Sequence, residues 1–171
     1  MKDVFLIYKG CCFYEIVILS YFLSYSHCEI CFCSPDGKPV QAMEGFTINA
    51  DVSLEGLGKA DIRSFIVPGG KILAIDTQEV HTCLRELRRR NTLIAGICAG
   101  VDVLDRAGVL RGIRSTHSED EDFVVDGNVI TARANAYVDF AVETAKKLGL
   151  FESDADLMET IGFWKHYKRV Q

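Results

Sequence analysis

The sequence predicts an α/β protein, a three-layer α/β/α sandwich with a mostly parallel β-sheet and one late β-hairpin. Short apolar runs rich in branched and aromatic residues alternate with longer segments of helical periodicity. Several runs end abruptly in glycine or proline, as strands do before they cross to a helix. Near the end of the chain, two apolar runs flank Asp126-Gly127-Asn128, a turn suited to positive φ angles. Strands that alternate with helices form a parallel sheet covered on both faces.

The first third of the chain predicts two strands joined by a helix. Residues 2–8, KDVFLIY, form a buried strand because branched and aromatic side chains dominate them. Gly10 marks a turn, and the helix that follows places several residues on one face: Phe13, Ile16, Val17, Ser20 and Leu23. Residues 29–34 form the second strand, which the turn signal of residues 34–37, SPDG, closes.

The middle of the chain repeats the pattern of strand, turn and helix. Residues 65–67 form a buried strand that ends in Pro68-Gly69-Gly70. A helix is expected from about residue 77 to residue 90, with three inward side chains: Val80, Leu84 and Leu87. Residues 92–97 form the next strand, and residues 101–107 form a short helix.

The last third of the chain predicts the hairpin and two closing helices. The hairpin strands are the runs DFVV and VITAR on either side of the turn, and the helices cover residues 138–148 and 156–166. The chain shows no internal repeat and no low-complexity linker. A length of 171 residues therefore corresponds to one domain, residues 1–171.

Composition and charge limit the partners. A net charge of −5 argues against a general nucleic-acid binder, and the triplet of residues 88–90, RRR, lies at a predicted helix end where cations are structurally favoured. Residues 11–25 are apolar but contain Glu15 and are too short to cross a bilayer. We expect no membrane partner. The start of the chain shows no secretory signal and the cysteines number seven, so free thiols in the cytoplasm are expected.

Cys98 is the candidate nucleophile. It lies where a strand turns directly into a helix, among the small residues Gly96, Ala99 and Gly100. A turn of this kind lifts a side chain above the sheet, as in the nucleophile elbow of hydrolases. The start of the helix is expected to lower the pKa of the thiol. A buried, inert cysteine is an equally frequent reading of this context alone.

Gly69 and Gly70 point to the second half of a site. Two glycines after a buried strand let backbone N–H groups approach a bound atom closely, as an oxyanion hole requires. The amide of Ala99 is the expected second donor. The carboxyl ends of parallel strands meet at one edge of a sheet, so these loops are expected to face the same crevice, together with residues 9–12.

Three motifs give the chain a resemblance to a known family. The segments FIVPGG at 65–70, IAGICAG at 94–100 and STHSED at 115–120 resemble the ThiJ/PfpI superfamily, and DGNVITARA resembles its late hairpin. The resemblance extends from Lys2 to about Leu148. It implies a flavodoxin-like fold similar to that of class I glutamine amidotransferases, and a homodimer.

Carried over position by position, the resemblance implies three catalytic residues. Cys98 is the nucleophile, and Glu15, early in the first helix, is its partner carboxyl with a pKa raised by the apolar crevice. His117 resembles the histidine near the thiol in the branch that contains the parkinsonism-associated protein. It would act as a base or orient the substrate.

Two departures from the family pattern restrict the function. Branches with a Cys–His pair carry histidine directly after the nucleophile, whereas this chain has Ala99, which argues against peptidase activity. Relatives often carry glycine where this chain has Ala134-Asn135, so no relative's substrate is transferred to it.

The remaining cysteines invite two other readings. A zinc site at His27, Cys28, Cys31 and Cys33 is disfavoured because these residues lie on a predicted strand and not on a tight turn. No metal and no cofactor are expected. Cys11 and Cys12 lie in a loop that should overhang the crevice, and one of them is a hypothetical disulfide partner for oxidised Cys98.

Three functions remain open at this point. The first is a cysteine-dependent enzyme that acts on a small reactive carbonyl or related electrophile by hydration, hydrolysis or deglycation. There the amides of Ala99 and Gly70 would hold the oxyanion while Glu15 and His117 move protons. The second is a redox sensor or oxidative-stress protein whose output is the oxidation of Cys98. The third is a non-catalytic, chaperone-like binding module.

Overall fold

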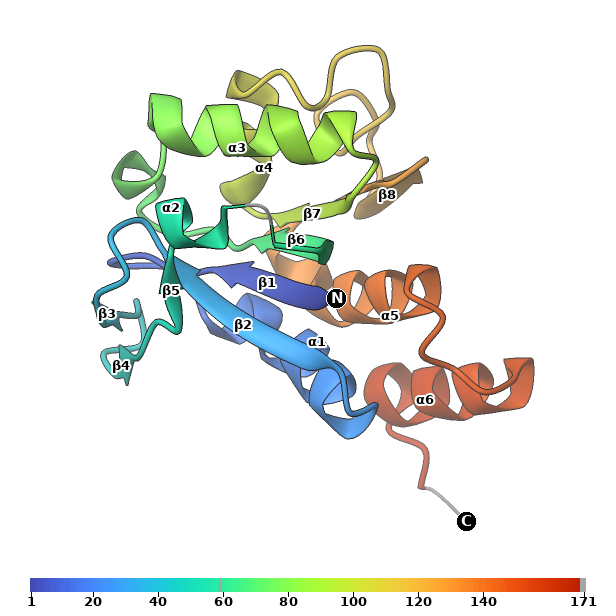
Figure 1. The fold of residues 1–171 in the computed structure, drawn as a ribbon. Helices are drawn as coiled ribbons and strands as arrows, with labels where there is room; N and C mark the ends of the chain where they lie inside the picture. Colours follow the sequence, from blue (N-terminus) through green and yellow to red (C-terminus); the bar gives the residue numbers. More distant parts are fainter. Residues whose placement is uncertain (59, 170–171) are drawn as a thin grey trace.

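The computed structural model describes residues 1–58 and 60–169 and shows a β-sheet between two layers of helices (Figure 1). The sheet has seven strands in the order β5-β2-β1-β6-β7-β9-β8. All neighbouring strands are parallel except β8 and β9. The strand bounds are β1 Lys2–Leu6, β2 Glu29–Ser34, β5 Val52–Ser53, β6 Ile62–Val67, β7 Leu93–Ile97, β8 Phe123–Asp126 and β9 Val129–Ala132. The expected α/β/α sandwich, with a mostly parallel sheet and a late hairpin, is confirmed.

Helices cover both faces of this sheet (Figure 1). On one face lie α1 (Tyr14–Tyr25), α5 (Tyr137–Lys147) and α6 (Asp154–His166). On the other face lie α3 (Gln78–Arg89) and α4 (Gly100–Arg106). The smaller elements are β3 Val40–Gln41, β4 Thr47–Ile48, α2 Leu54–Leu57 and the 3₁₀ turns Ile72–Ala74 and Ala134–Ala136.

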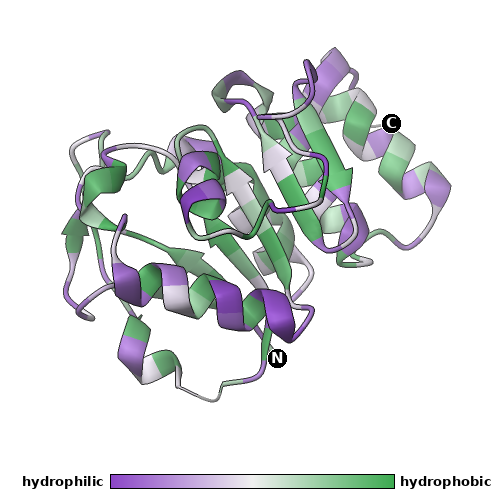
Figure 2. Ribbon diagram, turned by 90° about the horizontal axis from the view of Figure 1, so that it is seen from above, coloured by the Kyte–Doolittle hydropathy of each residue, from purple (hydrophilic) through white to green (hydrophobic). Residues whose placement is uncertain are grey.

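The central strands feed two separate apolar cores. Successive side chains of a strand point to opposite faces, so Val4 and Leu6 pack under α3 and α4 whereas Phe5 packs under α1 and α5. The central strands are therefore mostly apolar on both faces, and polar residues gather on the outer faces of the helices (Figure 2). This explains why the strands appear in the sequence as continuous apolar runs.

The sequence-based boundaries hold for the long elements and fail for the short ones. Residues 29–34 form a strand as predicted, whereas the strand predicted for residues 65–67 begins earlier, at Ile62. Of the residues predicted to share one face of the first helix, Ile16 and Leu23 are buried, whereas 43% of the surface of Val17 is exposed. The buried side of α1 consists of Glu15, Ile16, Ile18, Leu19, Phe22 and Leu23.

The lengths of the helices show whether any of them could cross a membrane. The longest helix in the described part of the chain, α6, has 13 residues. A bilayer requires about 20 residues. No helix among the described residues could therefore span a membrane.

The cysteines of β2 behave as core residues. Cys31 and Cys33 point to one face of the strand and are both buried there, as expected. All seven cysteines of the chain are free thiols.

Candidate active site at the ends of the central strands

Three loops meet where β1, β6 and β7 end. These strands are neighbours at the centre of the sheet, so the loops that follow them share one edge. The amide of Cys12 donates to the carbonyl oxygen of Gly69 at 2.9 Å, and the amide of Lys71 donates to Gly10 at 3.0 Å. These two hydrogen bonds join the loop after β1 to the Pro68-Gly69-Gly70 loop after β6.

Cys98 occupies a strained backbone position directly after β7. Its φ angle is +56°, in the left-handed region that residues other than glycine rarely adopt. Its amide donates to the carbonyl of Ala132 in β9 at 2.9 Å, and α4 begins two residues later. The chain therefore turns from strand to helix at the thiol, which is half-buried. Strain at one residue is held by the structure around it and is common at functional sites.

Glycines allow the loops to pack against this turn. A Cβ atom on Gly69 would lie 2.7 Å from Cβ and 2.8 Å from Sγ of Cys98. A Cβ atom on Gly100 would lie 2.2 Å from the carbonyl oxygen of Val67. Both distances are far below van der Waals contact, so only glycine permits β6 and the turn after β7 to approach this closely.

Glu15 places its carboxyl group in the same space. Only 1% of its surface is exposed, and its Oε2 accepts a 2.7 Å hydrogen bond from the amide of Gly69. Oε1 accepts a weaker bond of 3.4 Å from the hydroxyl of Tyr14. Burial raises the pKa of the carboxyl, and hydrogen bonds to Gly69 and Cys98 oppose that rise. The expectation that Glu15 is buried with a raised pKa is confirmed.

The Cys98 thiol has a raised pKa, not a lowered one. Burial and then the negative charge of Glu15 raise its pKa to about 11. The amide of Ala99 faces the sulfur and favours the thiolate, but this effect is smaller. The expectation that the helix start would lower the pKa is therefore wrong, because desolvation and a neighbouring carboxylate outweigh one amide of a helix only seven residues long.

The amide donors divide into two groups. The N–H group of Gly69 is occupied by the Glu15 carboxylate. Within residues 1–58 and 60–169, the amide of Gly70 has no protein acceptor, and the amide of Ala99 faces only the Cys98 sulfur. Neither of these two amides donates to a protein oxygen atom in the part of the chain that the structure describes.

His117 is directed elsewhere. Its Nε2 lies 3.2 Å from Oδ1 of Asp102, and its Nδ1 lies 3.7 Å from Oδ2 of Asp105. Both carboxylates belong to α4, and all three side chains are largely exposed. The structure therefore brings Glu15, Gly69 and Cys98 together, whereas among the described residues it pairs His117 with α4 and not with the thiol.

Tyr8 is a site residue that the sequence did not single out. Its buried hydroxyl lies 2.9 Å from the carbonyl oxygen of Pro68 and 2.7 Å from that of Gly69, and it donates to this pair. The hydroxyl thereby holds the loop that contacts both Glu15 and Cys98. The available signal was a tyrosine at the end of an otherwise apolar run, because a buried phenol requires a polar partner.

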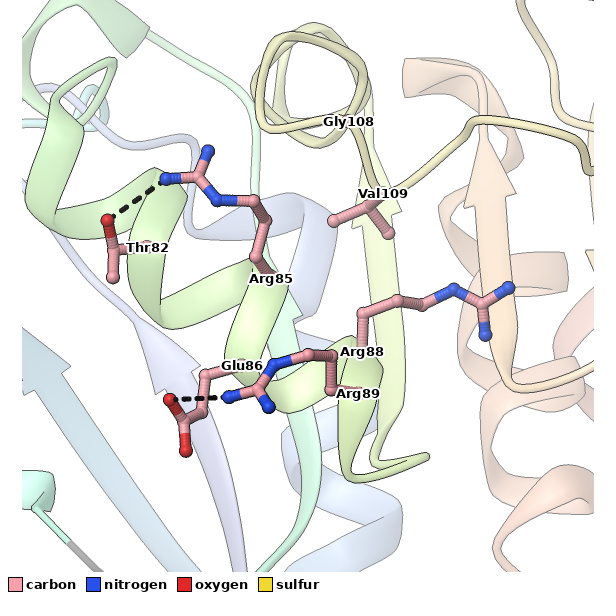
Figure 3. A pocket seen from close by; sticks show the side chains of 7 residues that line it. All are labelled: Thr82, Arg85, Glu86, Arg88, Arg89, Gly108 and Val109. Carbon is pink, nitrogen blue, oxygen red and sulfur yellow. Dashed lines mark hydrogen bonds and ion pairs between the residues drawn. The ribbon is translucent and has the colours of Figure 1, made fainter.

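The arginine-rich pocket in Figure 3 lies away from this site. It is formed by α3 and the residues after α4, and it is lined by Thr82, Arg85, Glu86, Arg88, Arg89, Gly108 and Val109. Arg85 donates to Thr82 and Arg89 donates to Glu86, as the dashed lines show. Arg90 also pairs with Glu86. Two arginines of the triplet at residues 88–90 thus pair with Glu86 of the same helix.

Comparison with known proteins identifies the most similar sequences. The sequence pattern of the DJ-1/PfpI family matches residues 1–147. A transcriptional regulator of the helix-turn-helix type, CdhR from Pseudomonas aeruginosa, is 41% identical over 83 residues. A deglycase from Pyrococcus abyssi is 26% identical over 111 residues. These matches cover 48% and 55% of the chain but only 24% of the regulator and 66% of the deglycase.

Solved structures show the same fold over nearly the whole chain. A DJ-1 superfamily protein from Agrobacterium tumefaciens superposes with a TM-score of 0.87 at 29% identity, covering 98% of this chain and 100% of the other. DJ-1beta from Drosophila melanogaster superposes with a TM-score of 0.80 at 23% identity, covering 94% of this chain and 95% of the other.

Proposed function

The chain belongs to the DJ-1/PfpI family, and from this premise we propose that it is a cysteine-dependent enzyme acting on a small reactive carbonyl compound. The reaction class is hydration, hydrolysis or deglycation of the electrophile. One observation carries the proposal: the buried Glu15 carboxyl is fixed by the amide of Gly69 directly beside the strained Cys98 thiol. A nucleophile with a proton acceptor in reach is the arrangement that covalent catalysis requires.

The chemistry follows from the raised pKa values. At neutral pH the thiol keeps its proton, so the Glu15 carboxylate removes it as sulfur attacks the carbonyl carbon. A carbon–sulfur bond forms, and the π electrons of the carbonyl move to its oxygen. The amides of Gly70 and Ala99 stabilise this oxyanion. Glu15 then returns the proton to the oxygen, and its own raised pKa favours that return.

Peptidase activity does not fit this site. A peptidase needs an imidazole that protonates the leaving amine, and the residue after the nucleophile is Ala99. His117 lies beside the carboxylates of Asp102 and Asp105 on α4. Glu15 is thus the proposed proton carrier, and His117 acts on the site only through Asp102, whose charge raises the pKa of Cys98.

A substrate screen that includes methylglyoxal tests the enzyme proposal. We expect turnover that disappears in both Cys98→Ser and Cys98→Ala. Cys83→Ser is the matched control, because Cys83 is also half-buried with a pKa raised to about 11 but lies on α3. No turnover in the native protein, or turnover that survives Cys98→Ala, would overturn the proposal.

A ligand-binding module is the second candidate function. The 41% identity with part of a transcriptional regulator supports it, because in a regulator the domain need only bind. The same variants separate the two functions. A binding module would retain affinity for a screened compound in Cys98→Ala, whereas the enzyme would lose turnover.

We also propose a homodimer that covers the outer face of α1. This helix carries apolar and aromatic residues on all sides, and its outer face exposes Tyr14, Val17, Tyr21 and Tyr25. A helix that is apolar all round is normally buried, so a second copy of the chain is the proposed cover. Sedimentation should show a dimer that Tyr21→Lys dissociates and that Leu73→Lys, also at an exposed apolar residue, leaves intact. A monomeric native protein would contradict this.

The proposed compartment is the reducing cytoplasm. All seven cysteines are free, and four of them are half-buried. Thiols of this kind persist in reducing compartments and pair in oxidising ones. Native mass spectrometry of protein purified without reductant checks this: extensive pairing of Cys28 or Cys83 would contradict it.

A further inference from the structure

A second cysteine, Cys12, lies next to the glycine that packs against Cys98. The amide of Cys12 is bonded to the carbonyl oxygen of Gly69 at 2.9 Å, and a Cβ atom on Gly69 would lie 2.8 Å from the sulfur of Cys98. The loop that carries Cys12 and the side chain of Cys98 therefore contact the same peptide unit.

Cys12 and Cys11 differ in what surrounds them. Cys11 is completely buried and packs in the core beneath α3 and α4, beside Tyr8 and Val67. Cys12 is half-exposed and lies three residues before Glu15 at the start of α1. Burial, then the charge of Glu15 and then the charge of an ionised Cys98 raise the pKa of Cys12 to about 11. The charge of Glu15 also raises the pKa of Cys11, but the charge of an ionised Cys98 acts on Cys12, which is the more exposed of the two thiols.

We propose that Cys12 is a resolving cysteine, which closes a disulfide with Cys98 after peroxide has oxidised Cys98 to a sulfenic acid. The inference rests on the reactivity of Cys98 proposed above, but not on any particular substrate. A sulfenic acid with no thiol partner is open to further oxidation to the sulfinic acid, which thiols do not reduce. The disulfide, in contrast, is reversible.

The proposed steps balance with peroxide as the oxidant. The Glu15 carboxylate first takes the proton of the Cys98 thiol. The thiolate then attacks one peroxide oxygen, the S–O bond forms and the O–O bond breaks. The leaving hydroxide takes a proton from Glu15 to become water. The resulting carboxylate removes the proton of Cys12, whose sulfur attacks the sulfur of Cys98. The S–S bond forms, the S–O bond breaks, and the second hydroxide receives the same proton from Glu15. Cys98 is oxidised, peroxide is reduced, and two waters leave.

Peptide mapping after one equivalent of hydrogen peroxide tests the proposal. In the native protein we expect a peptide that joins Cys12 to Cys98 and disappears on reduction with dithiothreitol. In Cys12→Ser we expect the loss of this peptide and the accumulation of sulfinic acid on Cys98. Cys11→Ser is the matched control, because it removes the adjacent thiol, and it should still form the bridge. Thermal melting confirms that each variant is folded.

The outcomes separate this inference from the proposed function. Sulfinic acid on Cys98 that accumulates equally in the native protein and in Cys12→Ser, with no joined peptide, overturns the resolving role while leaving a reactive nucleophile. A bridge from Cys98 to Cys11 also overturns it. Cys98 that neither oxidises nor reacts with iodoacetamide at any pH tested refutes the nucleophile itself, and the resolving role with it.

Discussion

The substitution Glu15→Gln should make Cys98 a better nucleophile toward an alkylating agent and a worse catalyst. Glutamine keeps the shape of the side chain and an oxygen that accepts from the amide of Gly69, but it removes the negative charge beside the thiol. That charge is the largest cause of the raised thiol pKa after burial. Its removal favours the thiolate, so the pKa of Cys98 should fall from about 11.

The size of the effect follows from charge separation. Two unit charges about 4 Å apart interact by about 4 kcal/mol at an effective dielectric constant of about 20, which corresponds to roughly three pKa units. The hydrogen bond from Gly69 offsets part of the carboxylate charge, so we expect a fall of about one to two units. Each unit gives about tenfold more thiolate, but the intrinsic reactivity of the thiolate decreases by about threefold. The net gain is about threefold to tenfold.

The assay is iodoacetamide labelling followed by peptide mapping between about pH 7 and pH 10. Cys83 is an internal reference, because the pKa of its thiol is also about 11 and Glu15 does not contribute to it. Labelling of Cys98 relative to Cys83 should rise in Glu15→Gln, while turnover should fall by about 10²–10⁴, since glutamine cannot carry a proton. Unchanged or slower labelling of Cys98 in the variant would refute the electrostatic reasoning.

Further predictions concern stability. Folding raises the pKa of Glu15, so its contribution to stability is full below the pKa of the unfolded chain and is lost as pH rises through the folded value. In urea denaturation, the stability of Glu15→Gln relative to the native protein should therefore increase as pH rises above about 4. A constant difference between the two proteins would contradict this. Gly69→Ala should lower the free energy of unfolding by about 1–3 kcal/mol and slow the labelling of Cys98, because the new Cβ would lie 2.7 Å from Cβ of Cys98. Gly162→Ala is the control and should do neither, because its new Cβ would meet only the flexible side chain of Lys168. Tyr8→Phe leaves the carbonyl oxygen of Pro68 without its donor and should lower the free energy of unfolding, measured in urea, by about 1–3 kcal/mol. Tyr25→Phe, at an exposed tyrosine, is the control. Equal stabilities of the two variants would refute the role of the Tyr8 hydroxyl.

The sequence predicted the architecture because the central strands are buried on both faces. The strand β7 appears as an uninterrupted apolar run, and the small residues around Cys98 predict the sharp turn observed there. Elements of two residues, such as β3, β4 and β5, leave no periodicity to detect. The exposure of Val17 could not be predicted, because α1 is apolar on all sides and its pattern does not define an inward face.

The electrostatics of the site could not be predicted at the same level. The sequence places Cys98 at a helix start, which favours the thiolate, but it does not reveal how deeply the thiol and Glu15 are buried together. The direction of the pKa shift depends on that burial. The pairing of His117 with Asp102 depends on how the loop after α4 folds back, and no local pattern encodes it.

At Cys98, the left-handed backbone favours glycine for stability, whereas the proposed reaction requires the thiol. Glycine adopts a φ angle of +56° without steric cost, so Cys98→Gly would relieve about 1 kcal/mol of strain while deleting the thiol. Selection for stability alone would therefore remove the nucleophile. Any attempt to make this protein more heat-resistant by consensus or computation must hold residue 98 fixed, because the substitution that the backbone favours is the one that abolishes the reactivity of the site.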